Sequence, residues 1–253
     1  MIITAPSTQY ASHIALQAIG RQGQQSITDS KVIVVGLGGL GCPVVQYLVG
    51  SGVGQLLLCD FDTISESNLA RQILYSFDDV NLSKADVARE RLLSLNPVCN
   101  ISVHKQRVEQ PYLQSVLSEY DLLIDASDNY GTRLSINRAC INTGTPWVMG
   151  SCIRFEGQLM FLNPGRAQDP CYRCVYGVAP ETLEDCPGAG IFAPVAGMIG
   201  TAMAHLALSQ LAGLDMPCEL NVLDAQILKW RKLQLIRNPD CPECGVKMNQ
   251  VDG

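Results

Sequence analysis

The sequence lacks the features that mark nucleic-acid-binding and membrane proteins. It has no run of Lys or Arg, its net charge is -6 and its pI is near 5.0, so it offers no basic surface to phosphate backbones or anionic membranes. The most apolar predicted helix, 193–212, is interrupted by glycine and histidine, and residues 1–10 lack the charge and apolar core of a signal peptide. We therefore expect a cytoplasmic protein that binds neither nucleic acid nor membranes.

Histidine is scarce, and a disulfide framework is not expected. The three histidines, His13, His104 and His205, have no partner at ligand spacing, so we assign them no chemical role. The chain has eleven cysteines, which is an odd number, and they are scattered through a sequence long enough to bury a large core. Most of them, such as Cys42 and Cys140, lie in apolar segments and are assigned to packing. Reduced thiols are therefore expected.

The first 150 residues alternate short apolar strands with helices. The predicted strands are 31–35, 55–59, 101–104 and 121–125, and the predicted helices are 42–49 and 84–95. Alternation of this kind predicts a mostly parallel sheet covered on both faces, with ligands at the carboxyl ends of the strands. This half of the chain therefore indicates a Rossmann-like α/β fold.

The second half has a different pattern. Strands predicted at 156–162, 220–223 and 229–235 surround the helix at 193–212 and indicate antiparallel pairing. The segment 163–194, rich in Pro, Gly and Cys, is long for a connection without structure, which points to a functional role. We expect a single mixed α/β domain over residues 1–253, with no internal repeat.

A glycine-rich turn directly follows the first predicted strand. Its glycines, Gly36, Gly38, Gly39 and Gly41, would let the backbone approach phosphate groups, and the following helix would supply free N–H groups and a favourable dipole. Asp60, at the end of the second strand, is placed to bind ribose hydroxyls. Taken alone, this loop is most typical of an NAD- or flavin-dependent oxidoreductase.

Other side chains favour a triphosphate ligand. Asn68, Arg71 and Lys84 follow the second strand, and a triphosphate benefits from Arg and Lys more than a dinucleotide does. Each of them could also be an ordinary surface residue. Asp128 and Asn129, after an apolar strand, could hold a magnesium ion that bridges phosphates, or could simply form a turn.

Two Cys-x-x-Cys pairs are the strongest local signal. The pairs Cys171/Cys174 and Cys241/Cys244 have the spacing in which two dyads complete one tetrahedral zinc site. Such a closed site is structural, and here it would fasten the carboxyl-terminal segment to the middle of the chain. Two unconnected dyads, or a redox pair, are the alternatives, although no thioredoxin-like pattern surrounds either pair.

Cys186 lies in a glycine-bearing loop and has two interpretations. An exposed thiol there could act as a nucleophile. Against this, Glu184 and Asp185 would raise its pKa, and no nearby His or Lys would lower it. An unreactive loop thiol is the alternative, and the sequence leaves the choice open.

The motifs and their order along the chain resemble those of the E1-like ThiF, MoeB and HesA proteins, which adenylate ubiquitin-like sulfur carriers. The resemblance covers most of the chain, from about Gly23 to Gly245. It implies that the carboxylate of a carrier's carboxyl-terminal Gly-Gly attacks the α-phosphorus of ATP and gives an acyl-adenylate and pyrophosphate. The carrier then accepts sulfur for thiamine, molybdopterin or a related metabolite.

The resemblance also implies roles for parts of the chain. Residues 1–30 would form an arm, 31–150 the ATP-binding half, and 151–253 the half with the carrier-binding surface, crossover loop and zinc site. The implied ATP ligands are Gly36, Gly38, Gly39, Gly41, Asp60, Ser67, Asn68, Arg71, Lys84, Asp128 and Asn129. Arg71, Lys84 and Asp128 would be catalytic, with Asp128 on magnesium. Cys186 matches a cysteine that takes part in sulfur transfer in ThiF-like members and is unnecessary in MoeB-like ones.

The sequence departs from the family at one position. Members usually carry Tyr-x-Arg-Gln near the amino terminus, and its arginine reaches the partner's ATP site in a homodimer, but Ser12 stands there in this chain. Loss of such an arginine can cost several orders of magnitude in rate. Alternatives are therefore a non-catalytic or specialised binding protein, or adenylation of a peptide tail. The resemblance further implies a homodimer, with sulfur delivered by a separate donor such as a cysteine desulfurase.

Overall fold

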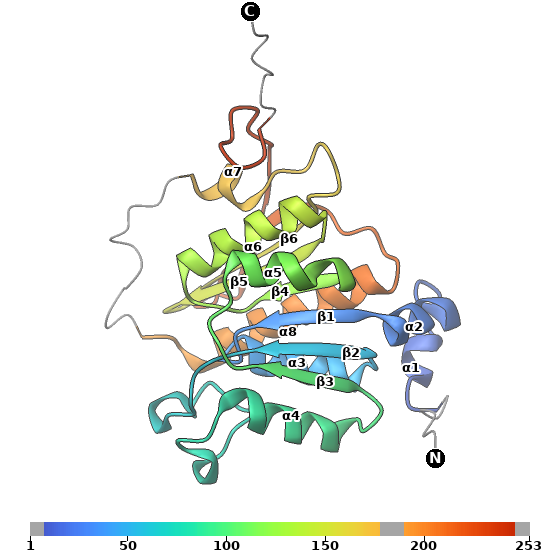
Figure 1. The fold of residues 1–253 in the computed structure, drawn as a ribbon, viewed down its shortest axis with the longest axis vertical. Helices are drawn as coiled ribbons and strands as arrows, with labels where there is room; N and C mark the ends of the chain where they lie inside the picture. The colour runs from blue at the N-terminus through green and yellow to red at the C-terminus, as the bar shows by residue number, and fades with distance from the viewer. Residues whose placement is uncertain (1–7, 178–189, 246–253) are drawn as a thin grey trace, which may run out of the picture.

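An eight-stranded mixed sheet forms the centre of the computed structural model, which describes residues 8–177 and 190–245 (Figure 1). The strand order is β3-β2-β1-β4-β5-β6-β7-β8. Pairs from β3 to β5 are parallel and pairs from β5 to β8 are antiparallel, which confirms the predicted mixed sheet. The strands are β1 Lys31–Val35, β2 Gln55–Cys59, β3 Asn100–His104, β4 Leu122–Asp125, β5 Trp147–Ile153, β6 Glu156–Leu162, β7 Glu219–Asp224 and β8 Lys229–Gln234.

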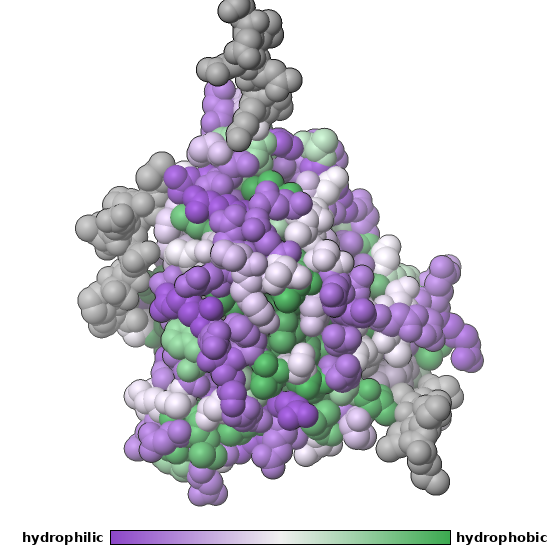
Figure 2. All heavy atoms as spheres, viewed as in Figure 1, coloured by the Kyte–Doolittle hydropathy of each residue, from purple (hydrophilic) through white to green (hydrophobic). Residues whose placement is uncertain are grey.

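Helices cover both faces of the sheet. Strand β1 shows why, because Val32 and Val34 point into one apolar core while Ile33 and Val35 point into the other. The first core lies under α3 (Gly41–Gly50), α4 (Lys84–Leu95) and α8 (Ala193–Leu211), and the second under α5 (Gln110–Val116) and α6 (Tyr130–Thr143) (Figure 1). Polar residues cover most of the outer surface on the α5 and α6 side (Figure 2).

Helix caps place two site residues at the carboxyl ends of the strands. Ser83 caps α4 by accepting a hydrogen bond from the Asp86 backbone N–H at 3.3 Å, so the first residue of this helix is Lys84. Asn129 caps α6 by accepting from the Thr132 backbone N–H at 2.9 Å. Each cap contributes about 1 kcal/mol to stability.

The amino-terminal arm lies at the opposite ends of the strands, beside the start of β1 (Figure 1). It comprises α1 (Ala11–Ile14) and α2 (Gly20–Asp29). The buried Tyr10 hydroxyl accepts a hydrogen bond from Asn96 Nδ2 at 3.0 Å, which fixes the arm against the turn before β3. Ser12 is exposed on α1. The arm therefore lies far from the carboxyl ends of its own strands.

Several elements were not located from the sequence. Helices α5 and α6 lie in 105–145, where the predicted pattern named none, and the short helix α7 (Tyr172–Tyr176) lies within the 163–194 connection. Helix α6 turns small or polar residues such as Asn137 and Ala139 inward, so its apolar periodicity is weak. Predicted bounds elsewhere differ from the observed ones by about one residue, as is usual at frayed ends. No helix in the described ranges is long and apolar enough to cross a membrane.

Candidate active site

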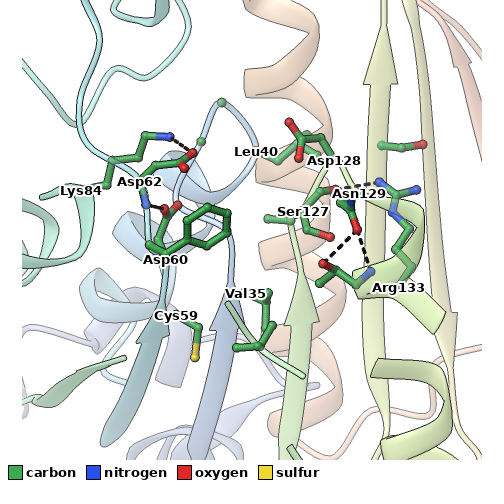
Figure 3. Close-up of a pocket in the computed structure, with 18 of the residues that line it drawn as sticks. Val35, Leu40, Cys59, Asp60, Asp62, Lys84, Ser127, Asp128, Asn129 and Arg133 are labelled. Atoms are coloured by element: carbon green, nitrogen blue, oxygen red, sulfur yellow. Dashed lines mark hydrogen bonds and ion pairs between the residues drawn. The ribbon is translucent and has the colours of Figure 1, made fainter. Parts of the chain in front are cut away.

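A cavity of about 790 Å³ opens at the carboxyl ends of β1, β2 and β4. In Figure 3, Asp60, Asp62 and Lys84 form one side, and Asp128, Asn129 and Arg133 lie on the other. Parallel strands gather their following loops at this edge, so residues from distant parts of the sequence meet here.

The glycine loop passes closely under the start of α3. Gly36 has φ +90°, and a Cβ there would lie 2.7 Å from the Ala126 carbonyl oxygen. A Cβ at Gly41 would lie 2.0 Å from the Gly36 carbonyl oxygen, so only glycine allows the loop to close onto the helix. Gly36, Gly38 and Gly39 line the cavity, whereas Gly41 does not.

Asp60 organises the loops that follow β1 and β2. Its Oδ2 accepts the Leu37 backbone N–H at 2.7 Å and its Oδ1 accepts the Asp62 backbone N–H at 2.8 Å. Burial raises the pKa of Asp60, and the charge of Lys84 and these two hydrogen bonds act against that rise. An ionised carboxylate accepts about four hydrogen bonds, so Asp60 retains capacity for ribose hydroxyls.

Lys84 is a buried cation held at the cavity wall. It is 5% exposed, and its Nζ lies 2.9 Å from Oδ2 of Asp62. The side chain of Asp62 is half exposed, so water shields that carboxylate better than it shields the ammonium group. An entering phosphate could therefore replace Asp62 as the partner of Lys84 without breaking a fully buried pair.

Arg71 and Asn68 form a second polar pair. Arg71 Nη2 donates to Asn68 Oδ1 at 2.5 Å, just after the 3-10 helix Glu66–Asn68. Gln72 is 3% exposed, and its Oε1 has no hydrogen-bond partner within the described ranges. Gln72 is one of the residues that line the cavity, and a buried amide oxygen without a partner is a candidate acceptor for a ligand or for water. Gln72 ends the motif segment 67–72, but no local pattern distinguishes it as a site residue.

The loop after β4 is held by hydrogen bonds to Asp125 and Arg133, whose Oδ2 and Nε atoms lie 3.9 Å apart. Asp125 is fully buried, and its Oδ1 accepts from the Ser127 hydroxyl at 2.6 Å, while Arg133 Nη2 donates to the Ser127 carbonyl at 2.7 Å. Burial raises the pKa of Asp125, and the Arg133 guanidinium opposes this rise. The fixed loop aims the Asp128 carboxylate at the cavity (Figure 3). The Asn129 side-chain oxygen is already engaged in capping α6.

The cavity brings together most of the predicted ATP ligands. Gly41 and Ser67 do not line it, and the Ser67 hydroxyl instead lies 3.0 Å from the Ser65 hydroxyl. Cys186 lies outside the described residues. The remaining predicted ligands all line the cavity, namely Gly36, Gly38, Gly39, Asp60, Asn68, Arg71, Lys84, Asp128 and Asn129.

Other lining residues had no role in the sequence analysis. The Arg107 guanidinium lies 5.2 Å from the centre of the Phe61 ring, at the end of the cavity beside β2 and β3. Arg133, Tyr172 and Tyr176 border the opposite side. A single Phe, Arg or Tyr outside any sequence motif gives no local signal, so only the folded structure shows that it lines the cavity.

The four motif cysteines meet in space, and their sulfur atoms all lie within 4.8 Å of one another. The Sγ–Sγ distances are 3.9 Å for Cys171–Cys174, 3.7 Å for Cys171–Cys241 and 3.5 Å for Cys174–Cys244. Tetrahedral Zn²⁺ with Zn–S bonds of about 2.3 Å places its sulfurs about 3.8 Å apart, so these thiols fit a metal of this kind.

Comparisons with known proteins agree with this geometry. The protein-family model described as the ThiF family matches residues 10–244. The sulfur carrier protein ThiS adenylyltransferase of Escherichia coli is 40% identical over 238 residues, which is 94% of each chain. The molybdopterin-synthase adenylyltransferase of Salmonella typhimurium is 38% identical over 239 residues, covering 94% of this chain and 96% of the relative.

Solved structures show the same fold at lower identity. Escherichia coli MccB with ATP superposes with a TM-score of 0.79 and 24% identity, over 88% of this chain and 69% of that one. PaaA superposes with a TM-score of 0.78 and 19% identity, over 94% of this chain and 76% of that one.

The sheet, the cavity and the near full-length relatives define an adenylyltransferase with an E1-like fold. Within that class, the chain belongs to the ThiF family. The resemblance inferred from the motifs is thereby confirmed, and the oxidoreductase suggested by the glycine loop alone is not supported.

Proposed function

We propose that this protein uses ATP to adenylate the carboxyl-terminal Gly-Gly of a ThiS- or MoaD-like sulfur carrier, which prepares the carrier for sulfur transfer. The observation that carries this proposal is the cavity, where Asp60, Arg71 and Lys84 converge beside the glycine loop. Relatives at about 40% identity are named as a sulfur carrier protein ThiS adenylyltransferase and a molybdopterin-synthase adenylyltransferase. Whether the product serves thiamine, molybdopterin or another sulfur metabolite depends on the carrier.

In this proposal the cavity residues bind ATP by exchanging their present partners for phosphate oxygens. Lys84 would leave Asp62, and Arg71 would leave Asn68, so that both cations face the triphosphate. Backbone N–H groups within 38–41 would bind phosphate oxygens, because those of Gly36 and Leu37 already donate to Cys59 and Asp60, and Asp60 would accept hydrogen bonds from the ribose hydroxyls. Lys84 would thereby exchange one anionic partner for another, and Arg71 would exchange a neutral amide oxygen for an anionic one.

The proposed chemistry is a substitution at the α-phosphorus. A carboxylate oxygen of the carrier's last glycine forms the new bond to phosphorus, and the bond from phosphorus to the oxygen that bridges the α- and β-phosphates breaks. Pyrophosphate leaves with that oxygen, and the carrier retains AMP as an acyl-adenylate. Lys84 and Arg71 would stabilise the negative charge that builds on the phosphate oxygens, which is the larger part of catalysis in such reactions.

Two metals belong to the proposal. Asp128 offers a hard carboxylate at the cavity, which suits Mg²⁺, and a bound Mg²⁺ supplies charge neutralisation to the phosphates. The four-thiol cluster suits Zn²⁺, which would fasten the segment around Cys241 and Cys244 to α7.

The proposal includes a homodimer and a separate sulfur donor, such as a cysteine desulfurase. The position of the arm supports the dimer, because α1 and α2 lie at the amino ends of the strands, away from the cavity of their own chain. A residue of α1 or α2 that contacts an ATP site would therefore contact the site of another copy.

A second candidate is a binding protein that docks the carrier without activating it. The exposed Ser12 on α1 favours it, because the family usually places an arginine at this position. Carrier binding without pyrophosphate release, at saturating MgATP, would support this candidate. Restoration of pyrophosphate release by Ser12→Arg would identify the missing side chain as the cause.

The proposed activity is tested by incubating the protein with MgATP and a ThiS- or MoaD-like carrier. The adenylated carrier is detected by intact mass spectrometry, and a carrier lacking its last two glycines is the matched control. We expect AMP to appear on the full carrier alone. An AMP-modified control carrier, or an unmodified full carrier that binds, would contradict the proposal.

A further inference from the structure

One short helix borders both the cysteine cluster and the cavity. Helix α7 spans Tyr172–Tyr176, Cys171 precedes it as its N-cap, and Cys174 lies within it. On the same five-residue helix, Tyr172 and Tyr176 line the cavity. A displacement of the cluster must therefore also displace part of the cavity wall.

Tyr172 fixes α7 against the body of the protein. It is 3% exposed, and its ring centre lies 4.7 Å from that of Tyr176 and 6.1 Å from that of the buried Trp147. Its backbone N–H donates to Asn137 Oδ1 at 2.9 Å, from a fully buried part of α6. The aromatic contacts and this hydrogen bond define one position for the helix.

Arg133 connects this wall to the loop that carries Asp128. The Arg133 guanidinium donates to the carbonyl oxygens of Ser127 at 2.7 Å and Gly150 at 3.1 Å, and Arg133 lines the cavity together with Tyr172. From α7, Arg173 Nη1 donates to the hydroxyl of Tyr130, the first residue of α6, at 2.8 Å. Contacts thus run from α7 to the start of α6, the helix that carries Arg133 and directly follows the Asp128 loop.

Helix α7 is too short to be stable alone, so its position depends on these contacts together with the cysteine cluster. An isolated helix of five residues is far below the length at which helices are stable in water. The cluster joins α7 to cysteines 70 residues further along the chain, and the Asn238 backbone N–H lies 3.5 Å from Cys174 Sγ. The ion pair of Arg138 with Glu243, at 2.8 Å, supports the second dyad.

We propose that the metal-bound cysteine cluster positions the cavity wall formed by Tyr172, Arg133 and the Asp128 loop, and so sets the affinity for MgATP. This inference rests on the proposed function for the ATP cavity alone and does not depend on the carrier. It gives the cluster a role beyond fastening the carboxyl-terminal segment. Tyr172 and Arg133 are positioning residues in this account, because they act through the loop.

The first test compares zinc-loaded protein with protein stripped by a chelator, in the Trp230→Phe background. The chain has two tryptophans, so Trp147 then reports alone on the surroundings of α7. We expect stripping to change the Trp147 emission and to raise the Kd for MgATP at least tenfold, which is the loss of about one charge-assisted hydrogen bond. Folded stripped protein with unchanged emission and unchanged Kd would overturn the inference.

A second variant decides the matter if stripping unfolds the protein. Tyr172→Leu should retain one zinc per chain and still bind MgATP about tenfold more weakly. The control is Tyr112→Leu, at a partly buried tyrosine in the same core that stacks on His104 and does not line the cavity, and it should leave the Kd unchanged. Native MgATP affinity in zinc-loaded Tyr172→Leu would overturn the inference.

The two proposals fail in distinguishable ways. If the zinc-loaded protein binds MgATP but leaves the carrier unmodified, the proposed function fails while the comparison of Kd values still applies. If the protein binds no MgATP at all, the proposed function is wrong. An unchanged Trp147 emission after stripping would then also overturn the proposed coupling between the cysteine cluster and the cavity wall.

Discussion

Replacing Asp60 with alanine tests the nucleotide site at the residue on which its shape most depends. The substitution removes the acceptor of the Leu37 and Asp62 backbone N–H groups, at 2.7 and 2.8 Å. Leu37 is fully buried, so its N–H stays without a partner and costs about 1–3 kcal/mol of stability. The Asp62 N–H lies in an exposed residue, where water can replace the carboxylate at little cost.

Asp60→Ala should also weaken ATP binding directly, in addition to lowering the free energy of unfolding. Loss of hydrogen bonds from ribose hydroxyls to a carboxylate costs about 1.5–3 kcal/mol, which corresponds to a Kd for MgATP about 10- to 150-fold higher. Calorimetric titration measures the Kd, and urea unfolding measures the stability of the same samples.

A neighbouring carboxylate supplies the control for this experiment. Asp62→Ala removes the ion-pair partner of Lys84 at 2.9 Å but leaves the acceptor of Leu37 in place. Its Kd for MgATP should be unchanged or lower, because phosphate no longer competes with a carboxylate for the lysine. Wild-type affinity in Asp60→Ala would refute the assignment of Asp60 to the nucleotide.

Three further substitutions test separate parts of the account. Lys84→Ala should lower the rate of carrier adenylation at saturating ATP about 100-fold or more, in a pyrophosphate-release assay, because it removes a cation that stabilises the reacting phosphate. Gly41→Ala should cost about 1–3 kcal/mol in urea unfolding, since its Cβ would lie 2.0 Å from the Gly36 carbonyl oxygen, whereas Gly50→Ala, whose Cβ would meet Leu95 Cδ2 at an ordinary 3.9 Å, should not destabilise α3. The third substitution is Asp79→Asn. Burial raises the pKa of Asp79, but hydrogen bonds from Ser76 and the charge of Arg91 outweigh burial and lower this pKa below its ordinary value of 3.8. The stability this carboxylate contributes is therefore complete above pH 3.8 and is lost as pH falls through the lower, folded-state pKa, so an acid titration of unfolding free energy should be flatter for Asp79→Asn than for the wild type.

The parts of the fold that could be predicted are those in which local chemistry and tertiary structure agree. The strand Lys31–Val35 is apolar after its exposed first residue because it is buried on both faces, and the glycine loop after it has a distinctive pattern. Helix Lys84–Leu95 has a serine cap and ends before proline, so both of its ends can be predicted from the sequence. The cysteine dyads could be predicted to meet because one tetrahedral site needs four ligands.

The rest depends on contacts between distant residues. Helix α6 packs Asn137 inward to accept the Tyr172 backbone N–H, which is a tertiary requirement that no local pattern reveals. Arg133 likewise has the sequence context of an ordinary helical arginine, and only the fold shows that it binds two carbonyl oxygens next to the cavity. The motifs also include Gly41 and Ser67, which do not line the cavity, and their role as ATP ligands stays a prediction.

The most direct test of the central claim is ATP–pyrophosphate exchange by the zinc-loaded protein, with and without a ThiS- or MoaD-like carrier that ends in Gly-Gly. Exchange reports the reversible formation of the acyl-adenylate itself, before any sulfur transfer. We predict exchange that requires the carrier and disappears when its last two glycines are removed. Absence of exchange with a carrier that demonstrably binds would contradict the account.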